Sequence, residues 1–228
     1  MPPLRRHQLA FVTADGWKHV LARTWSEPVK SGLAHWAAQG LPVVVTRQLP
    51  TRANPSGRIA LGVCLPETWG RQRVALQLEP NQLSMFTEFP SLTASLGALS
   101  AVQRKAMRHL ATSLAANHLQ ARVYGSVGWQ TVTGLPYLHD HSDIDLWLAV
   151  KDAHTADTAV GLLQQVEGLK RRVDGELVFP DGSAVAWREW DAWRRGRCKR
   201  LLVKHLLGQE LREEMVGDER QRQGETAT

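Results

Sequence analysis

Short apolar runs, rich in β-branched side chains and separated by Pro, Gly and Asn turns, dominate the first ninety residues. Runs of this length between turn residues predict strands, which we place at 42–46, 59–65 and 74–78. Apolar residues recur at near-helical spacing over 28–39 and stop at Gly40, which predicts a helix. We therefore expect residues 1–90 to form a small α+β domain.

A capping box marks the first helix of the second half. Residues 91–97 are interpreted as a linker, and Ser100-x-x-Gln103 then satisfies the pattern of a helix N-terminus. Behind it, apolar residues repeat at the helical period and predict a helix that leads to a Gly-Ser turn; they are Val102, Ala106, Leu110 and Leu114.

The remaining pattern mixes strands and helices. It predicts, in order, an apolar strand over 146–150, a helix over 155–169, a hairpin of 172–179 and 183–187 around Pro180-Asp181-Gly182, and a last helix over 190–207. We expect a second domain over 98–216. The polar, small-residue tail 217–228 is predicted to be disordered.

Two carboxylates, Asp143 and Asp145, open the apolar strand. Residues two apart on an extended chain project to the same side, so both acids would face one way while Ile144 and Leu146 face the other. Two acids on one edge repel each other, and a divalent cation most readily offsets that cost. Oxygen-only ligands suit Mg²⁺, which is commonly held by carboxylates together with substrate phosphates.

A Gly-Ser pair, Gly125 and Ser126, lies seventeen residues before Asp143. Glycine lets the backbone come close to a phosphate, and successive amides of such a turn form an anion-binding concavity. Each signal is weak alone, because Gly-Ser is a common turn and an Asp-x-Asp can be an exposed edge. Together with a third acid they predict phosphoryl or nucleotidyl transfer.

The predicted hairpin supplies that third acid. Asp174 and Glu176 flank Gly175 and share one strand face, so either would lie beside the first pair if their strand neighbours it. We favour Asp174, whose short side chain precedes the glycine. Glu176 is expected to pair with Arg188 on the hairpin partner, although periodicity alone does not separate the two acids.

Charge and cysteine content narrow the functional classes. With 28 basic against 22 acidic residues, the formal charge of +6 favours anionic partners, but the excess is mild and nucleic acid is not expected. Cys64 and Cys198 are too isolated for a zinc site or a disulfide framework. No apolar run approaches a membrane span and no signal-peptide core is present, so we expect a cytoplasmic protein. His7, His19 and His35 are scattered and suggest no site.

Residues 125–146 read G-S-x-G-W-Q-x-x-T-G-L-P-Y-L-x-x-x-S-D-I-D-L. This string resembles the malonate decarboxylase holo-acyl-carrier-protein synthases, the phosphoribosyl-dephospho-CoA transferases of the nucleotidyltransferase superfamily. The stretch 174–190 is also similar to that family, and the match is strongest over 122–190. The resemblance implies an α+β fold whose second domain is a nucleotidyltransferase-like mixed sheet with flanking helices. It leaves substrate or carrier recognition as the candidate role of residues 1–90.

The function implied by the resemblance is transfer of 2′-(5″-phosphoribosyl)-3′-dephospho-CoA from 2′-(5″-triphosphoribosyl)-3′-dephospho-CoA to a serine of the apo acyl-carrier protein subunit of malonate decarboxylase. Diphosphate is released. Asp143, Asp145 and Asp174 would hold two Mg²⁺ ions, with Glu176 as the alternative third acid, and Gly125 and Ser126 would bind the phosphates.

Two other functions are weighed against this one. The same acids would serve a nucleotidyltransferase that acts on a small-molecule acceptor, although the residues from Gly134 to Tyr137 speak against it. A non-catalytic nucleic-acid-binding module is supported only by the basic balance of the chain, and its affinity would fall steeply with salt.

Overall fold

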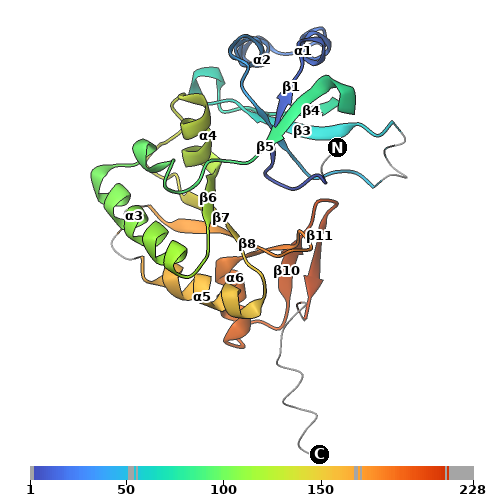
Figure 1. The fold of residues 1–228 in the computed structure, drawn as a ribbon. Helices are drawn as coiled ribbons and strands as arrows, with labels where there is room; N and C mark the ends of the chain where they lie inside the picture. The colour runs from blue at the N-terminus through green and yellow to red at the C-terminus, as the bar shows by residue number, and fades with distance from the viewer. Residues whose placement is uncertain are drawn as a thin grey trace, which may run out of the picture.

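Each half of the chain builds its own β-sheet (Figure 1). The computed structural model describes residues 3–50, 54, 56–166, 169, 171–213 and 215. The first sheet has five strands in the order β4-β3-β2-β1-β5, and the second has six in the order β11-β10-β9-β8-β7-β6. Helices accompany both sheets, so the predicted α+β class is confirmed. Among the described residues, no helix combines the length and the apolar character needed to cross a membrane.

The first sheet is antiparallel throughout. Its elements are β1 (Leu9–Val12), α1 (Ala14–Leu21), α2 (Glu27–Gln39), β2 (Val43–Val45), β3 (Ile59–Cys64), η2 (Glu67–Trp69), β4 (Arg73–Leu78), η3 (Pro80–Gln82) and β5 (Leu83–Thr87). The three predicted strands and the predicted helix are all present. The elements β1, α1 and β5 were not predicted; β1 is a short apolar run without a clear alternation, and β5 is a mostly exposed edge strand.

The second sheet is mixed, as the resemblance implied. Its elements are η4 (Leu96–Ala98), α3 (Ala101–Ala116), β6 (Ala121–Tyr124), α4 (Gly125–Thr133), β7 (Ile144–Ala149), α5 (Ala153–Gln164), β8 (Val173–Val178), β9 (Ala184–Ala186), α6 (Trp187–Arg194), β10 (Leu201–Lys204) and β11 (Gln209–Arg212). Only β7 and β8 pair in parallel, and α5 connects them; the other neighbours are antiparallel. The acid-bearing strands β7 and β8 therefore lie side by side.

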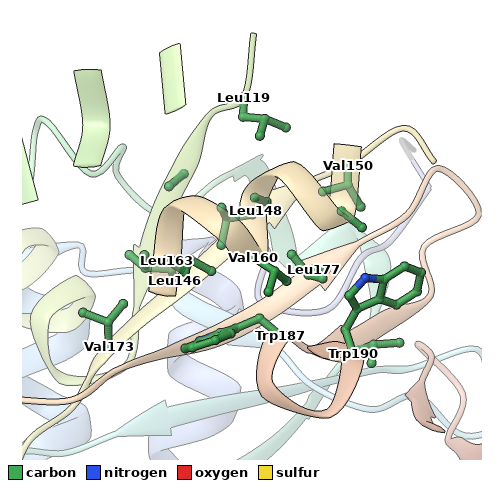
Figure 2. Close-up of a cluster of buried hydrophobic side chains, with 14 of the residues drawn as sticks. Leu119, Leu146, Leu148, Val150, Val160, Leu163, Val173, Leu177, Trp187 and Trp190 are labelled. Carbon is green, nitrogen blue, oxygen red and sulfur yellow. The ribbon is translucent and has the colours of Figure 1, made fainter. Parts of the chain in front are cut away.

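A large hydrophobic core fills the space between this sheet and the helices α3, α5 and α6 (Figure 2). On β7 the even-numbered residues Ile144, Leu146 and Leu148 are fully buried in it. Leu163 of α5 and Trp190 of α6 belong to the same cluster. Because strand side chains alternate, Asp145 and Trp147 are left on the opposite face of the sheet.

The last predicted helix, over 190–207, is wrong. The helix α6 ends at Arg194, and Gly196 adopts a left-handed conformation with φ of 71°. The chain then forms the hairpin β10–β11, in which Leu201 and Val203 are buried and alternate with more exposed residues. Apolar residues at spacings of four and five resembled a helix, but a left-handed glycine ends a helix and the strand alternation takes over.

Three smaller expectations also need correction. The segment 91–97 is packed rather than a free linker, since Leu92 is buried and its N–H donates to the Ala121 carbonyl at 2.9 Å. Val102 is 69% exposed, although Leu110 and Leu114 are buried as predicted. The helix expected to reach Leu169 ends at Gln164. The capping box at Ser100 is present, and the predicted tail 217–228 lies outside the described residues.

Candidate active site

Three carboxylates meet where β6 ends and where β7 and β8 begin. Asp145 is paired across the sheet with Tyr124 of β6 on one side and with Asp174 of β8 on the other. Asp143 precedes β7 by one residue, and Arg171 braces the loop before it by donating to the carbonyls of His139 and Ser142. The sheet register thus brings together three of the predicted acids.

Arg172 is the cation that this acid cluster contacts. One guanidinium nitrogen donates to Asp143 Oδ2 at 3.0 Å and to Asp174 Oδ2 at 2.9 Å. Its side chain remains 57% exposed, so these are surface ion pairs of small energy. Arg172 reduces the repulsion between the two acids without burying the site.

Asp145 lies deeper than its neighbours. Burial, followed by the charges of Asp143 and Asp174, raises the pKa of this carboxyl from 3.8 to about 6. Such a shift means that the folded chain disfavours the ionised form of Asp145 at this position. A cation placed between the acids would reverse that preference, as expected of a metal-binding carboxylate.

Gly125 is required because Asp145 approaches it so closely. It begins α4 with φ of 59°, and a Cβ on it would lie 1.9 Å from Asp145 Oδ2. Because α4 begins at Gly125, the Gly-Ser pair forms the first turn of a helix and not a free turn. Helix N-termini present unpaired N–H groups and favour anions. Gly125 and Ser126 also line a cavity of about 610 Å³.

Glu176, the other predicted acid, belongs to a different environment. It is 4% exposed, and its Oε1 accepts a hydrogen bond from Lys204 Nζ at 2.7 Å. Its Oε2 lies 3.3 Å from His7 Nε2, and Arg6 is 3.7 Å away from Oε1. Burial alone would raise its pKa, but His7, Lys204 and Arg6 outweigh burial and lower the pKa to about 2.

The expected partner of Glu176, Arg188, is not its partner. Arg188 stacks over the Trp187 ring at 4.1 Å and donates to the Val173 carbonyl at 3.0 Å. Lys204 holds Glu176 instead, from the strand β10 that the sequence analysis had interpreted as a helix. Because Lys204 was predicted to lie on a helix and not on a strand of this sheet, its contact with Glu176 was not expected.

Comparison with known proteins agrees with the resemblance seen in the sequence. The family described as phosphoribosyl-dephospho-CoA transferase MdcG, C-terminal domain, matches residues 91–215, and the corresponding N-terminal domain matches 5–89. The chain belongs to the phosphoribosyl-dephospho-CoA transferase family.

Curated relatives cover most of the chain. A phosphoribosyl-dephospho-CoA transferase of Xanthomonas campestris pv. campestris (strain 8004) is 36% identical over 204 residues, which is 89% of this chain and 91% of the relative. One of Bradyrhizobium diazoefficiens is 33% identical over 213 residues, covering 90% and 88% of the two chains. One of Azotobacter vinelandii is 36% identical over 198 residues, covering 80% and 84%. No solved structure matches the chain.

The carboxylate oxygens of Asp143, Asp145 and Asp174 are of the kind that binds Mg²⁺, but the three side chains are not arranged around one metal position. No group of three His, Cys, Asp or Glu side chains in the described part of the chain is spaced to hold a metal ion. Arg172 contacts two of the three acids, and because its side chain is 57% exposed these ion pairs are weak. Oxygen donors, mutual repulsion and the raised pKa of Asp145 all fit a hard divalent cation at this place.

The N-terminal domain of the transferase supplies residues that the sequence analysis had set aside. His7 has a φ of 60°, which is uncommon for a residue with a side chain, and its ring lies 4.4 Å from that of Tyr124. With Arg6 it ties the N-terminal segment to Glu176. No local signal marks this role, because it depends on contacts between distant parts of the sequence.

The cavity beside Gly125 also lies between the two domains. Arg71, Gln72 and Arg73 line it from the first domain, and the segment 136–139 lines it from the second. Arg71 pairs with Glu67 at 2.7 Å, whereas Arg73 is exposed. The Tyr137 hydroxyl donates to the Cys64 carbonyl and joins the two walls. Cations from the first domain thus face the start of α4.

Proposed function

We propose that this chain transfers the 2′-(5″-phosphoribosyl)-3′-dephospho-CoA group from its 5″-triphosphate to a serine of the apo acyl-carrier subunit of malonate decarboxylase. The reaction would take place in the cytoplasm. Membership of the phosphoribosyl-dephospho-CoA transferase family supports the group that is transferred. The acceptor and the residue roles are our assignment.

The observation that carries the proposal is the convergence of Asp143, Asp145 and Asp174 beside the first turn of α4. Carboxylates alone would repel a triphosphate. The site therefore needs cations, and we assign Asp143, Asp145 and Asp174 as the holders of Mg²⁺, with two ions expected. When bound, the ions would neutralise charge on the transferring phosphoryl group and on the leaving diphosphate.

In the proposed step, a bond forms between the carrier serine oxygen and the α-phosphorus of the triphosphate. The anhydride bond between the α- and β-phosphates breaks, and diphosphate leaves with its electron pair. The serine proton passes to a carboxylate, for which we assign Asp174. Glu176 is a poor acceptor, because His7, Lys204 and Arg6 hold it ionised with a pKa of about 2.

The first turn of α4 is assigned to the β- and γ-phosphates. The N–H groups of Gly125 and Ser126 and the Ser126 hydroxyl are donors at a helix N-terminus, where negative charge is favoured. Arg71 and Arg73 line the same cavity and add positive charge. This arrangement would leave the α-phosphate next to Asp145, since Gly125 touches that residue.

Intact-mass spectrometry tests the proposal. The apo carrier subunit is incubated with this chain, Mg²⁺ and the triphosphoribosyl substrate, and we expect the carrier to gain the mass of one phosphoribosyl-dephospho-CoA group. Matched reactions use Asp145→Asn, a carrier whose acceptor serine is replaced by alanine, and EDTA. An unmodified carrier with wild-type enzyme would contradict the acceptor assignment, and modification in EDTA would contradict the metal assignment.

A further inference from the structure

Two neighbouring cavities of about 730 and 540 Å³ lie beyond the acid cluster, away from Gly125. Both are lined by the same four residues, Arg5, Trp147, Val178 and Gly182, so they meet at these side chains. Each volume is within the range of small-molecule sites. Neither cavity contains Asp143, Asp145 or Asp174 in its lining, so they are separate from the assigned phosphate site.

Trp147 is the aromatic residue shared by the two cavities. It lies on the open face of β7, two residues beyond Asp145, which places their Cα atoms roughly 7 Å apart. Its side chain is half-buried and makes no hydrogen bond or ring contact with any residue that the structure describes. Trp190, by contrast, donates to Asp157 at 2.8 Å and packs against Phe179. The indole of Trp147 is thus available to a ligand.

Arg5 is the corresponding available cation. Its side chain is exposed and forms no ion pair within the described ranges of the chain. The other arginines of the larger cavity are occupied, since Arg6 contacts Glu176 and Arg212 pairs with Glu210 at 2.6 Å. An unpaired guanidinium beside an unpaired indole is the combination that recognises a nucleotide, through its phosphate and its base.

We propose that these cavities bind the adenosine diphosphate part of the dephospho-CoA group, with the adenine stacked on Trp147 and the 5′-diphosphate paired with Arg5. The inference rests on the proposed function and assigns the part of the substrate that does not react. In that substrate the phosphoribosyl unit is attached to the 2′ position of the adenosine. The base therefore lies only two sugar rings from the reacting phosphate, which agrees with the proximity of Trp147 and Asp145 on one strand face.

Calorimetric titration with dephospho-CoA tests the stacking partner without any transfer reaction. Trp147→Ala is expected to weaken binding roughly 5- to 150-fold, the range for loss of one base–aromatic stack. Trp147→Phe should retain most of the affinity, and inorganic triphosphate should bind both variants as it binds the wild type. Trp25→Ala in the first domain, whose ring lies under Arg23 at 4.7 Å, is the matched control.

The proposed contact between Arg5 and the diphosphate is tested with two ligands, dephospho-CoA and adenosine. Arg5→Ala should weaken dephospho-CoA roughly 10-fold, as for loss of a charge-assisted contact, and should leave adenosine binding unchanged. Arg108→Ala, an exposed arginine on α3, is the matched control and should change neither. Thermal melts of every variant establish that the chain is folded.

The outcomes separate this inference from the proposed function. Unchanged dephospho-CoA affinity in folded Trp147→Ala, or no binding by the wild-type chain, would overturn the inference even if the carrier is modified. A variant that loses only affinity for the carrier would also overturn it and assign the cavities to the protein partner. Binding that depends on Trp147 and Arg5 in a chain that modifies no carrier would uphold the inference and refute the proposed acceptor.

Discussion

Asp174 and Glu176 lie two residues apart on one face of β8, yet their surroundings are opposite. Asp174 belongs to a partly exposed cluster of three acids, and within the described residues the cation that it pairs with is Arg172, whose side chain is 57% exposed. Glu176 is buried among Lys204, His7 and Arg6. The first region has three carboxylates and one exposed arginine in contact with them, whereas Glu176 alone is contacted by three basic side chains. Two carboxylates on the same strand thus have different surroundings, and we assign Asp174 to the proposed chemistry and Glu176 to contacts with the N-terminal segment.

The largest effect is expected where the acid cluster is deepest. Asp145→Asn should lower the rate of transfer by on the order of 10³-fold. The change removes a carboxylate charge that would hold the metal, and the metal is expected to stabilise the transition state by several kcal/mol. Without Mg²⁺, the same change should leave stability equal or higher, since Asp145 is repelled by Asp143 and Asp174. Single-turnover rates and urea denaturation measure the two effects. Near-normal turnover of this variant with Mg²⁺ would refute the metal site.

The second prediction compares the two acids of β8 directly. Asp174→Asn should slow the chemical step by ~10²–10⁴-fold with little loss of stability, as expected for removal of a general base. Glu176→Gln should be far milder in the chemical step but should cost about 3 kcal/mol of folding free energy, because Lys204, His7 and Arg6 lose their buried counter-charge. Rapid-quench rates and denaturation curves of both variants decide the assignment, and a larger rate loss in the glutamate variant reverses it.

The sequence predicted the features of this contrast that depend on local patterns, and it did not predict those that depend on contacts between residues far apart in the chain. Strand alternation is local, so it correctly placed Asp174 and Glu176 on one face of β8, and the pairing of Asp145 with Asp174 puts that face on the same side of the sheet as Asp145. The neighbours of Glu176 come from β10 and from the N-terminal segment, and neither was predicted. The pattern of Trp193, Cys198, Leu202 and Leu206 fits a helix until Gly196 is known to be left-handed. Local periodicity cannot supply a partner that a distant strand provides.

The third prediction uses two glycines at the two ends of α4, both with positive φ. Gly125→Ala should lower transfer by about 10²-fold, because its Cβ would displace Asp145 by more than an ångström. Gly134→Ala is the matched control: its φ of 71° carries similar backbone strain, but no atom lies within 4 Å of the added Cβ. It should cost only about 1 kcal/mol of stability. Equal activity losses in both variants would mean that strain, rather than contact with Asp145, explains the glycine.

The fourth prediction concerns pH, where the two regions should act in opposite directions. The pKa of Asp145 rises on folding from 3.8 to about 6, so its contribution to the stability of the metal-free chain is full below pH 4 and is lost as the pH rises through 6. The loss is about 2 kcal/mol after allowance for partial exposure. The pKa of Glu176 falls from 4.5 to about 2, so its contribution is present above pH 4.5 and is lost toward pH 2.

Denaturation curves between pH 2 and 7 measure both slopes in EDTA. Asp145→Asn should flatten the decline between pH 4 and 6 and leave the acid limb unchanged, whereas Glu176→Gln should do the reverse. Added Mg²⁺ should abolish the decline between pH 4 and 6 in the wild type, because a bound cation favours the ionised carboxylate. An identical pH profile in the wild type and both variants would mean that the two carboxylates do not differ in environment.

The smallest effect is expected at Ser126, which lies at the margin of the acid region. Ser126→Ala removes one hydroxyl from the first turn of α4 but keeps the backbone N–H groups that we assign to the phosphates. A single hydrogen bond has a net worth of ~1 kcal/mol, so the dissociation constant of the triphosphate substrate should rise about 5-fold. Ser113→Ala, on the far helix α3, is the matched control and should change nothing. Calorimetric titration of both variants measures the difference, and an effect of Ser126→Ala as large as that of Gly125→Ala would mean that the hydroxyl, and not the helix backbone, holds the phosphates.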